Sequence, residues 1–353
     1  MPFKYLVLAA ELQAKISDGT FTDKLPTEEN IVETYGYSRQ TVRRALDSLV
    51  EHGLIEKHRG SASRIRQRVR ERDNSLIAIV TTFSNDYIFP TVLQDIQTVL
   101  TANGYSTILF FTQNEITSER KILQDLLRKP IGGVIIEGTK TALPSPNLDL
   151  YEKLFQANIP TVFLHGTYSA LRDTLCVSDD NFGGGYMLAR HLISRGHTKI
   201  AGIFKSDDIQ GHQRYLGFLS AMRDAGLPIP DNHVCWYSTE ERRYLLDYGH
   251  PDLLEHFRHF YLQDCTATIC YNDEVADRLI RYFLSLGYHI PEDMAVVSFD
   301  NSYYSDLCPV PITSLAHQIK LGSEAAQLIL DRIEGRPCES HSFSWRLIKK
   351  QSG

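Results

Sequence analysis

The stretch "YSRQTVRRALDSLVEHGLIEKHRGSAS", residues 37–63, decides how the front of this chain folds. It places Arg39, Arg43 and Arg44 within six residues and ends in a second basic cluster around a glycine. Residues 38–72 carry a net charge of +6, whereas the whole 353-residue chain carries −6. A local basic segment on an acidic protein indicates a small polyanion-binding module attached to a different kind of domain. The length predicts two or three domains.

The residues after Ser38 have the spacing of one amphipathic helix, for which Ser38 is a suitable N-cap and Gly53 a stop. We expect one stripe of it to pack against preceding helices, formed by Val42, Ala45, Leu46, Leu49 and Val50. The other side carries side chains that suit guanine and adenine edges in the major groove: Arg39, Gln40, Arg43 and Arg44. Because its first turn holds no acidic residue, the positive helix end is open to a phosphate.

Two shorter helices are predicted before this one. Apolar residues recur at helical spacing in 4–17. Thr27 suits the N-cap of the second helix, Glu28 and Glu29 suit its positive end, and Gly36 ends it.

A wing is predicted after the third helix. Residues 54–65 indicate two short strands around Arg59 and Gly60. The order helix, helix, capped helix and wing predicts a winged helix-turn-helix that binds DNA. The arginines taken alone would also suit a solvated basic surface.

From residue 75 onward, short apolar runs alternate with amphipathic helical patterns. We expect eight strands, at 76–82, 106–112, 133–138, 160–166, 199–206, 233–238, 267–272 and 295–301. Because these runs are apolar throughout and separated by helices, they predict parallel sheets in two doubly wound lobes. We predict a DNA-binding domain at 1–66, a polar linker at 67–74, and an effector-binding and dimerisation domain at 75–353.

Polar and aromatic residues follow the expected strands, at the edge where open α/β sheets bind ligands. Acids and amides suit the hydroxyls of a neutral polyol, and aromatic rings stack on its C–H face. The candidate effector-binding residues are Asp86, Tyr87, Phe89, Glu137, His165, Arg214, Asn272, Asp273, Asp300 and His317. Individually, Asp86 and Asp300 could cap helices, His165 could be an ordinary interior histidine, and Arg214 could form a surface ion pair.

The segment "LPTEENIVETYGYSRQTVRRALDSLVEHGLIEKHRG" resembles the winged helix-turn-helix of GntR-type transcriptional regulators, over about residues 4–66. The resemblance implies that seven residues lie at the DNA: Glu28, Ser38, Arg39, Gln40, Thr41, Arg43 and Arg44. It also places Gly60 at the wing tip, beside Arg59. The wing departs from the family, because "RGSASRI" lacks a second glycine and an aromatic residue.

Residues 75–350 resemble the effector domain of LacI/GalR-type repressors, which is similar to periplasmic sugar-binding proteins. The matching segments are "VSDDNFGGGYMLARHLISRGHTKIAGI", "QRYLGFLSAM", "YNDEVADRLI" and "VVSFDN". The resemblance implies two lobes joined by three crossovers, with the ligand between them. Lobe one is expected at about 75–177 and 317–338, and lobe two at about 178–316 and 339–353. Family pattern makes Arg214, Asn272 and Asp300 ligand contacts, with His317 near another pocket position.

The combination of these two parts, with "SNDYIFP" and "IIEGTK", resembles the arabinose repressors of Gram-positive bacteria. It implies a sugar-responsive repressor that binds palindromic operator DNA as a homodimer and is released by a small neutral sugar, with L-arabinose favoured. The same architecture could respond instead to another pentose, a disaccharide or a sugar phosphate, or could act as an activator.

Other classes of protein lack support in the sequence. The run "DNFGGGYMLA" fails the dinucleotide pattern, because Leu188 stands where a third glycine is needed. The six cysteines show no metal-ligand spacing. The N-terminus lacks the features of a signal peptide, and no apolar run approaches the roughly 18 residues needed to span a membrane. We therefore expect a cytoplasmic protein that is not an enzyme and uses no metal, cofactor or membrane.

Overall fold

The protein is described by a computed structural model in which two compact units, Met1–Asp73 and Asn74–Gly353, each have their own core. The described residues are 4–17, 20–21, 24–51, 54–56, 62–65, 75–84, 87–228, 231–246, 252–262 and 264–353. The expected linker, 67–74, lies outside these residues, as do Arg59, Gly60 and Asp86.

The first unit is the expected winged helix-turn-helix. Its elements are α1 (Lys4–Ser17), α2 (Glu28–Tyr35), α3 (Arg39–Glu51), β1 (Ile55–Glu56) and β2 (Arg64–Ile65). The Thr27 side chain accepts a hydrogen bond from the Asn30 amide at the start of α2, and Gly36 ends that helix in the left-handed conformation, with a φ of 69°. The strands β1 and β2 pair antiparallel and form the base of the wing.

The core of this unit lies between α1, α2 and α3. It contains Leu8, Leu12, Ile31, Val42, Ala45, Leu46 and Leu49, all buried. Val50 was expected on the same stripe of α3, and this expectation is wrong. Its side chain is 38% exposed, because it lies beyond the edge of the stripe that faces α1 and α2.

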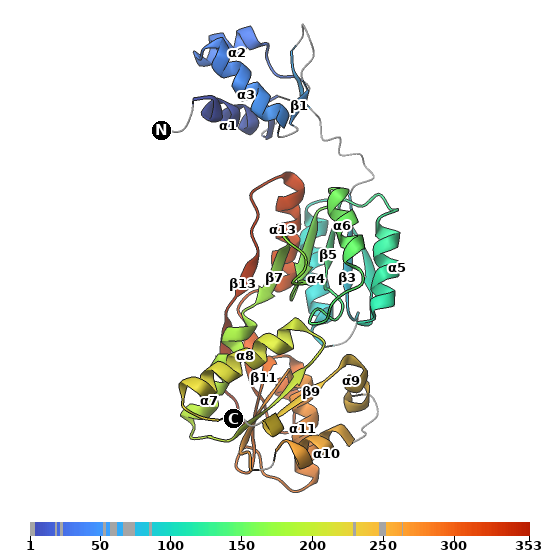
Figure 1. Cartoon of the computed structure of the whole chain (residues 1–353), viewed down its shortest axis with the longest axis vertical. Coiled ribbons are helices and arrows are strands. Elements are labelled where there is room, and N and C mark those ends of the chain that lie inside the picture. Colours follow the sequence, from blue (N-terminus) through green and yellow to red (C-terminus); the bar gives the residue numbers. More distant parts are fainter. Residues whose placement is uncertain are drawn as a thin grey trace. The chain divides into compact units, whose positions relative to one another are not determined.

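The second unit consists of two lobes, each built on one six-stranded sheet (Figure 1). Lobe one has the strand order β13-β7-β6-β5-β3-β4, and all its strands are parallel. Its strands are β3 (Leu76–Thr81), β4 (Ser106–Phe111), β5 (Gly133–Ile136), β6 (Thr161–Leu164), β7 (Leu175–Asp179) and β13 (His341–Phe343).

Helices cover both faces of the lobe-one sheet. One face packs against α4 (Phe89–Ala102) and α13 (Leu321–Glu334), and the other against α5 (Ile116–Leu126) and α6 (Leu148–Gln156). The strands are therefore buried on both sides, which is why β3, β5 and β6 consist almost entirely of buried residues.

Lobe two repeats this arrangement with the strand order β14-β12-β11-β10-β8-β9. Its strands are β8 (Ile200–Lys205), β9 (Val234–Tyr237), β10 (Ala267–Cys270), β11 (Ala295–Asp300), β12 (Thr313–His317) and β14 (Trp345–Ile348). The edge strand β14 is antiparallel to β12, and the other pairs are parallel.

One face of the lobe-two sheet packs against α7 (Asn181–Ser194) and α8 (Ile209–Asp224). The other face packs against the helices of residues 239–307, which are α9 (Thr239–Leu246), α10 (Asp252–Phe260), α11 (Asp273–Ser285) and α12 (Tyr303–Leu307). A short 3-10 helix, η2 (Asp231–His233), precedes β9.

The fold class and the eight expected strands are confirmed, but the prediction missed β7, β12, β13 and β14. The lobe boundaries also differ from those expected. Strand β13 pairs with β7 in lobe one, so the third crossover follows Phe343 instead of residue 338. The first crossover follows β7, at Asp179, and the second follows β12, at His317.

Within the described part of the chain, no helix combines the length and apolar character needed to cross a bilayer. The six cysteines are free thiols.

The glycine run at the start of α7 allows two helices to pack closely. A Cβ on Gly185 would lie 2.0 Å from the Arg214 carbonyl oxygen of α8, and a Cβ on Gly217 would lie 2.0 Å from the Phe182 carbonyl oxygen of α7. The two helix backbones therefore touch at these glycines, and this contact fixes how deeply α8 lies on the sheet. Within the run "FGGGY", Gly185 therefore serves the packing of α7 against α8.

We expect Gly185→Ala to destabilise lobe two by about 1–3 kcal/mol, because the added methyl group has no space. Urea unfolding followed by tryptophan fluorescence measures this change, since both tryptophans, Trp236 and Trp345, lie in lobe two. Gly183→Ala is the comparison variant, because the three atoms nearest its Cβ all belong to the Asp180 side chain, which caps α7, and none belongs to the α8 backbone. Equal losses for the two variants would contradict the packing role of Gly185.

Candidate functional site

The exposed side of α3 carries the candidate DNA-reading residues. Arg39 lies 3.1 Å from Glu29 and Arg43 lies 2.9 Å from Glu28, so two arginines of α3 pair with the first turn of α2. Both pairs are exposed to solvent and contribute little to stability. In this conformation they place the two guanidinium groups beside the start of α2.

The start of α3 is capped as expected. Ser38 Oγ accepts a hydrogen bond from the Thr41 amide at 3.3 Å, and the two hydroxyl groups are 2.9 Å apart. Gln40 and Arg44 are exposed on the same helix. The structure therefore gathers the seven described candidates at the α2–α3 surface, while Arg59 and Gly60 fall outside the described residues.

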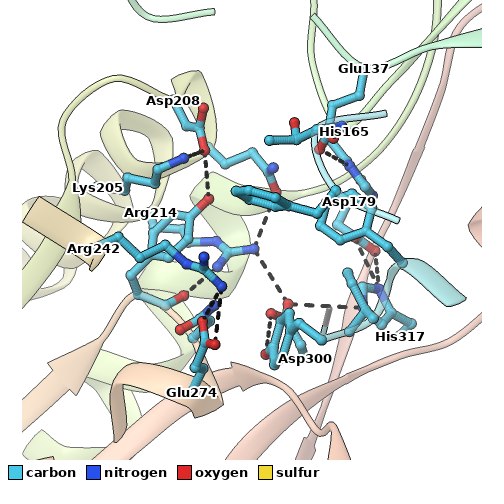
Figure 2. Close-up of a pocket in the computed structure, with 18 of the residues that line it drawn as sticks. Glu137, His165, Asp179, Lys205, Asp208, Arg214, Arg242, Glu274, Asp300 and His317 are labelled. Atoms are coloured by element: carbon cyan, nitrogen blue, oxygen red, sulfur yellow. Dashed lines mark hydrogen bonds and ion pairs between the residues drawn. The ribbon is translucent and has the colours of Figure 1, made fainter. Parts of the chain in front are cut away.

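The second unit, Asn74–Gly353, contains a pocket between the carboxyl ends of its two sheets (Figure 2). We refer to it below as the effector unit. Eight of the ten candidate residues line it: Tyr87, Phe89, Glu137, His165, Arg214, Asn272, Asp300 and His317. Other lining residues are Thr82, Phe83, Ile88, Asp179, Lys205, Asp208, Gln210, Tyr237, Arg242, Tyr271 and Glu274. Each parallel strand ends at this edge, so side chains distant in sequence meet there.

On the lobe-one side, Glu137 and His165 form a buried pair. Glu137 Oε1 lies 2.8 Å from His165 Nδ1, and Glu137 Oε2 accepts a hydrogen bond from the Thr82 amide at 2.8 Å. Burial alone would raise the pKa of Glu137, but the contacts with His165 and Thr82 outweigh it and lower that pKa. Burial alone would lower the pKa of His165, but Glu137 raises it above the ordinary value. The pair faces the pocket, and the pKa of each partner is shifted in the direction that favours its charged form.

Arg214 enters the pocket from α8 and is 2% exposed. Its Nε donates to Asn181 Oδ1 at 2.9 Å, its Nη1 donates to the Tyr271 carbonyl, and its Nη2 lies 3.6 Å from Asp300. The guanidinium group also lies over the Phe299 ring, 4.1 Å from its centroid. Arg214 is therefore a buried residue of the pocket lining and not part of a surface ion pair.

Asp300 lies next to Arg214 and His317 in the pocket (Figure 2) and also contacts lobe one. Its carboxylate accepts a hydrogen bond from the Tyr87 hydroxyl of lobe one at 2.6 Å. His317 Nε2 lies 3.9 Å away, and His317 Nδ1 lies 3.1 Å from Asp179 of lobe one. Asp300 does not cap a helix, because Ser302 precedes α12.

Two cations of the pocket were missed by the sequence reasoning. Lys205 Nζ lies 2.6 Å from Asp208, and Arg242 lies 2.8 Å from Glu274. Lys205 is the penultimate residue of the expected strand 199–206, so its place near a strand end was a signal that could have found it. Lys140, which follows the expected strand 133–138, is not among the lining residues and pairs with Glu240 at 2.6 Å.

Asp273 differs from the expectation, because it does not line the pocket. Its carboxylate is fully buried behind the pocket and accepts hydrogen bonds from Ser298, Ser302 and Ser314. Burial and the neighbouring Asp300 charge raise the pKa of Asp273 to about 7. Of the other pocket candidates, Asn272 uses its Oδ1 to cap α11, and Asp86 lies outside the described residues.

Further contacts join the lobes outside the pocket lining. Besides the Lys140–Glu240 pair, the Asn114 side chain donates to Thr239 Oγ1. The Ile209 amide donates to a hydroxyl of the facing loop in lobe one at 3.1 Å. The two lobes are therefore in contact at these residues as well as through the Tyr87–Asp300 hydrogen bond.

Comparison with known proteins identifies the two parts of the chain. Residues 4–65 match the family described as "Bacterial regulatory proteins, gntR family", and residues 189–352 match the "Periplasmic binding protein-like domain". Over 342 residues the chain is 35% identical to the "Arabinose metabolism transcriptional repressor" of Geobacillus stearothermophilus, covering 94% of this chain and 92% of that protein. The repressor of the same name from Halalkalibacterium halodurans is 31% identical over 346 residues, covering 95% of this chain and 90% of that protein.

The chain belongs to this family of arabinose metabolism transcriptional repressors. It is a sugar-responsive transcriptional repressor of the arabinose-repressor type, which confirms the resemblance found in its sequence. Solved structures support the fold. The "transcriptional regulator CelR-cellobiose complex" has a TM-score of 0.69 at 21% identity, covering 93% of this chain and 100% of that chain. The "transcription regulator GntR from Chromobacterium violaceum" has a TM-score of 0.68 at 24% identity, covering 78% and 98%.

The Glu137–His165 pair predicts how the stability of the effector unit depends on pH. The raised pKa of His165 means that its contribution is complete below its ordinary pKa of 6.5 and is lost as pH rises through the higher folded value. The lowered pKa of Glu137 means that its contribution is present above 4.5 and is lost as pH falls through the lower folded value. We expect stability to fall above pH 6.5 and this fall to be smaller in His165→Gln.

Urea unfolding at a series of pH values, followed by tryptophan fluorescence, measures this dependence. His289→Gln is the control, because the His289 side chain is 81% exposed and lies outside the pocket. The same pH profile in wild type and His165→Gln would contradict the assignment to His165.

Proposed function

We propose that this protein binds palindromic operator DNA as a homodimer through its winged helix-turn-helix units. A small neutral sugar, with L-arabinose favoured, binds the pocket between the two lobes and releases the repressor from the DNA. The charge pairing inside the pocket is the observation that carries the choice of a neutral ligand.

The lining holds its cations in pairs with acids. Among the described lining residues there are five carboxylates, on Glu137, Asp179, Asp208, Glu274 and Asp300, and three Lys or Arg side chains. Each of the three, Lys205, Arg214 and Arg242, lies within 4 Å of one of these carboxylates. An anionic ligand would have to displace those acids, whereas hydroxyl groups can use acids, amides and guanidinium groups together.

Aromatic side chains supply the apolar part of the lining. Phe83, Tyr87 and Phe89 come from lobe one, and Tyr237 and Tyr271 come from lobe two. Such rings stack on the C–H face of a sugar while their neighbours bind its hydroxyls. A pocket with both kinds of group suits a carbohydrate better than a purely apolar or purely charged ligand.

L-arabinose is favoured because the two repressors to which this chain is 31% and 35% identical are both named for arabinose metabolism. A structure with the same fold is titled as a cellobiose complex, so a disaccharide remains a ligand to test. Hydroxyl geometry inside the pocket separates these sugars, and a binding panel must decide between them.

The homodimer is supported by apolar side chains that one chain leaves exposed. In α12, Tyr303 is 51% exposed and Leu307 is 71% exposed. Leu286, just beyond the end of α11, is 48% exposed. A second copy of the chain would bury such surface, and a palindromic operator requires two heads related by twofold symmetry.

A sugar can release the repressor only if it binds the DNA-free form more tightly than the operator-bound form. Operator DNA must then weaken sugar binding by the same factor. The experiment that tests the function is fluorescence anisotropy of the protein on its own upstream DNA at fixed salt, with a panel of sugars and sugar phosphates added. Release by L-arabinose supports the proposal. Release by a sugar phosphate, or failure of every sugar in the panel to release the protein, contradicts the choice of ligand.

We expect Arg43→Ala to weaken operator binding by roughly 1–3 kcal/mol, because a bidentate contact to a base edge has this magnitude. Anisotropy on operator and on random DNA of the same length measures the change in discrimination. Arg223→Ala is the control, because that exposed arginine belongs to the effector unit. Unchanged discrimination in Arg43→Ala would remove its base-reading role.

We expect Asp300→Ala to abolish release by sugar while leaving operator binding intact. The variant removes a carboxylate that lies in the pocket and in no part of the DNA-binding unit. The same anisotropy assay, with sugar added at high concentration, measures this effect. Asp125→Ala is the matched control, since that side chain is exposed on α5 and lies outside both the pocket and the proposed dimer surface. Normal release in Asp300→Ala would exclude Asp300 from sugar binding.

A further inference from the structure

The turn after β11 has an unusual backbone conformation. Asp300 has a φ of 92° and Asn301 has a φ of 43°. Residues with a side chain rarely adopt positive φ, and two in succession persist only where surrounding contacts compensate for the strain. The turn that carries Asp300 into the pocket therefore depends on groups that hold it in place.

Asp273 holds this turn from behind. The amide and the hydroxyl of Ser302 donate to Asp273 Oδ2 at 2.6 and 3.0 Å. The Asn301 amide donates to Ser314 Oγ at 3.0 Å, and Ser314 donates in turn to Asp273 Oδ1 at 2.6 Å. Ser298 also donates to Asp273 Oδ1. One buried carboxylate therefore binds two successive residues of the turn, one directly and one through a serine.

The same turn presents the Asp300 carboxylate to the pocket. There it accepts the hydrogen bond of Tyr87 at 2.6 Å and lies 3.6 Å from Arg214 and 3.9 Å from His317. A change of backbone conformation at Asp300 would move its carboxylate away from all three partners. The position of the Asp300 carboxylate, which lines the pocket, thus depends on the Asp273 carboxylate, which does not.

We propose that Asp273 is a positioning residue of the effector pocket. It fixes the turn at 300–302 and, through this turn, the place of the Asp300 carboxylate, without itself contacting the ligand. This inference rests on the proposed function of the pocket as a sugar site. It replaces the expectation that Asp273 contacts the sugar directly.

The first test compares two buried carboxylates of α11 in the full-length protein. Asp273→Asn keeps the size of the side chain but places an NH2 group opposite donors of the turn, so we expect about tenfold weaker binding of L-arabinose. The fluorescence of Trp345, whose ring lies 4.7 Å from that of His317, reports the titration. Asp277→Asn is the control, because Asp277 is equally buried but pairs with Arg281, and we expect unchanged affinity.

A double-mutant cycle separates positioning from a general loss of packing. If Asp273 acts through Asp300, the losses in Asp273→Asn and Asp300→Asn do not add in the double variant. Additive losses, or an unchanged affinity in Asp273→Asn, would overturn the inference. Ser314→Ala is a second variant that removes one contact of the turn, and we expect a smaller loss in the same direction.

A crystal structure of the Asp273→Asn protein gives a result that does not depend on any sugar. We expect the turn to leave its positive-φ conformation and the Tyr87–Asp300 hydrogen bond to lengthen or break. An unchanged turn would overturn the inference even if the wild type binds sugar. Failure of the wild type to bind any sugar in the panel would refute the proposed function, while the crystal structure would still decide the role of Asp273.

Discussion

The buried guanidinium group of Arg214 is the constraint on which the arrangement of the effector unit depends. A charge removed from water is tolerated only when its donors are paired. Here the partners are Asn181 of α7, the Tyr271 carbonyl after β10, and Asp300 after β11. These elements cannot move independently without leaving a buried charge unpaired. The contact of α8 with Gly185 of α7 sets the depth from which this side chain reaches the pocket.

Much of the fold could be predicted because it depends on local rules. Caps such as Thr27 and Gly36 mark helix ends whatever surrounds them, so the three helices of the first unit were predicted from the sequence. The central strands of both sheets are apolar on both faces, and this pattern is also visible without a structure. The strands β7 and β12 lack it, because they bury polar groups such as Ser314 that bond to distant partners. The partners that satisfy such groups come from other elements, so no local pattern shows them.

The residues of the candidate site also divide into those that local sequence predicts and those that depend on partners from other elements. Residues at strand ends were gathered as expected, because parallel strands bring their carboxyl ends to one edge. The direction of each side chain could not be predicted from its position. Asn272 and Asp273 are neighbours, yet one lines the pocket and the other faces the serines behind it. The pairing of Arg242 with Glu274 depends on how α9 packs on α11, which is a property of the assembled fold.

The helix α12 begins at Tyr303, directly after the turn that carries Asp300. Its Tyr304 ring lies 6.1 Å from the Tyr87 ring, while Tyr303 and Leu307 face solvent. Asp300 of the pocket and the exposed side chains of Tyr303 and Leu307 thus belong to one short segment, residues 300–307. A ligand that displaces the Asp300 carboxylate therefore acts on residues that are directly bonded to this surface. If a second copy of the chain covers α12, residues 300–307 would connect the occupancy of the pocket directly to the interface between the copies.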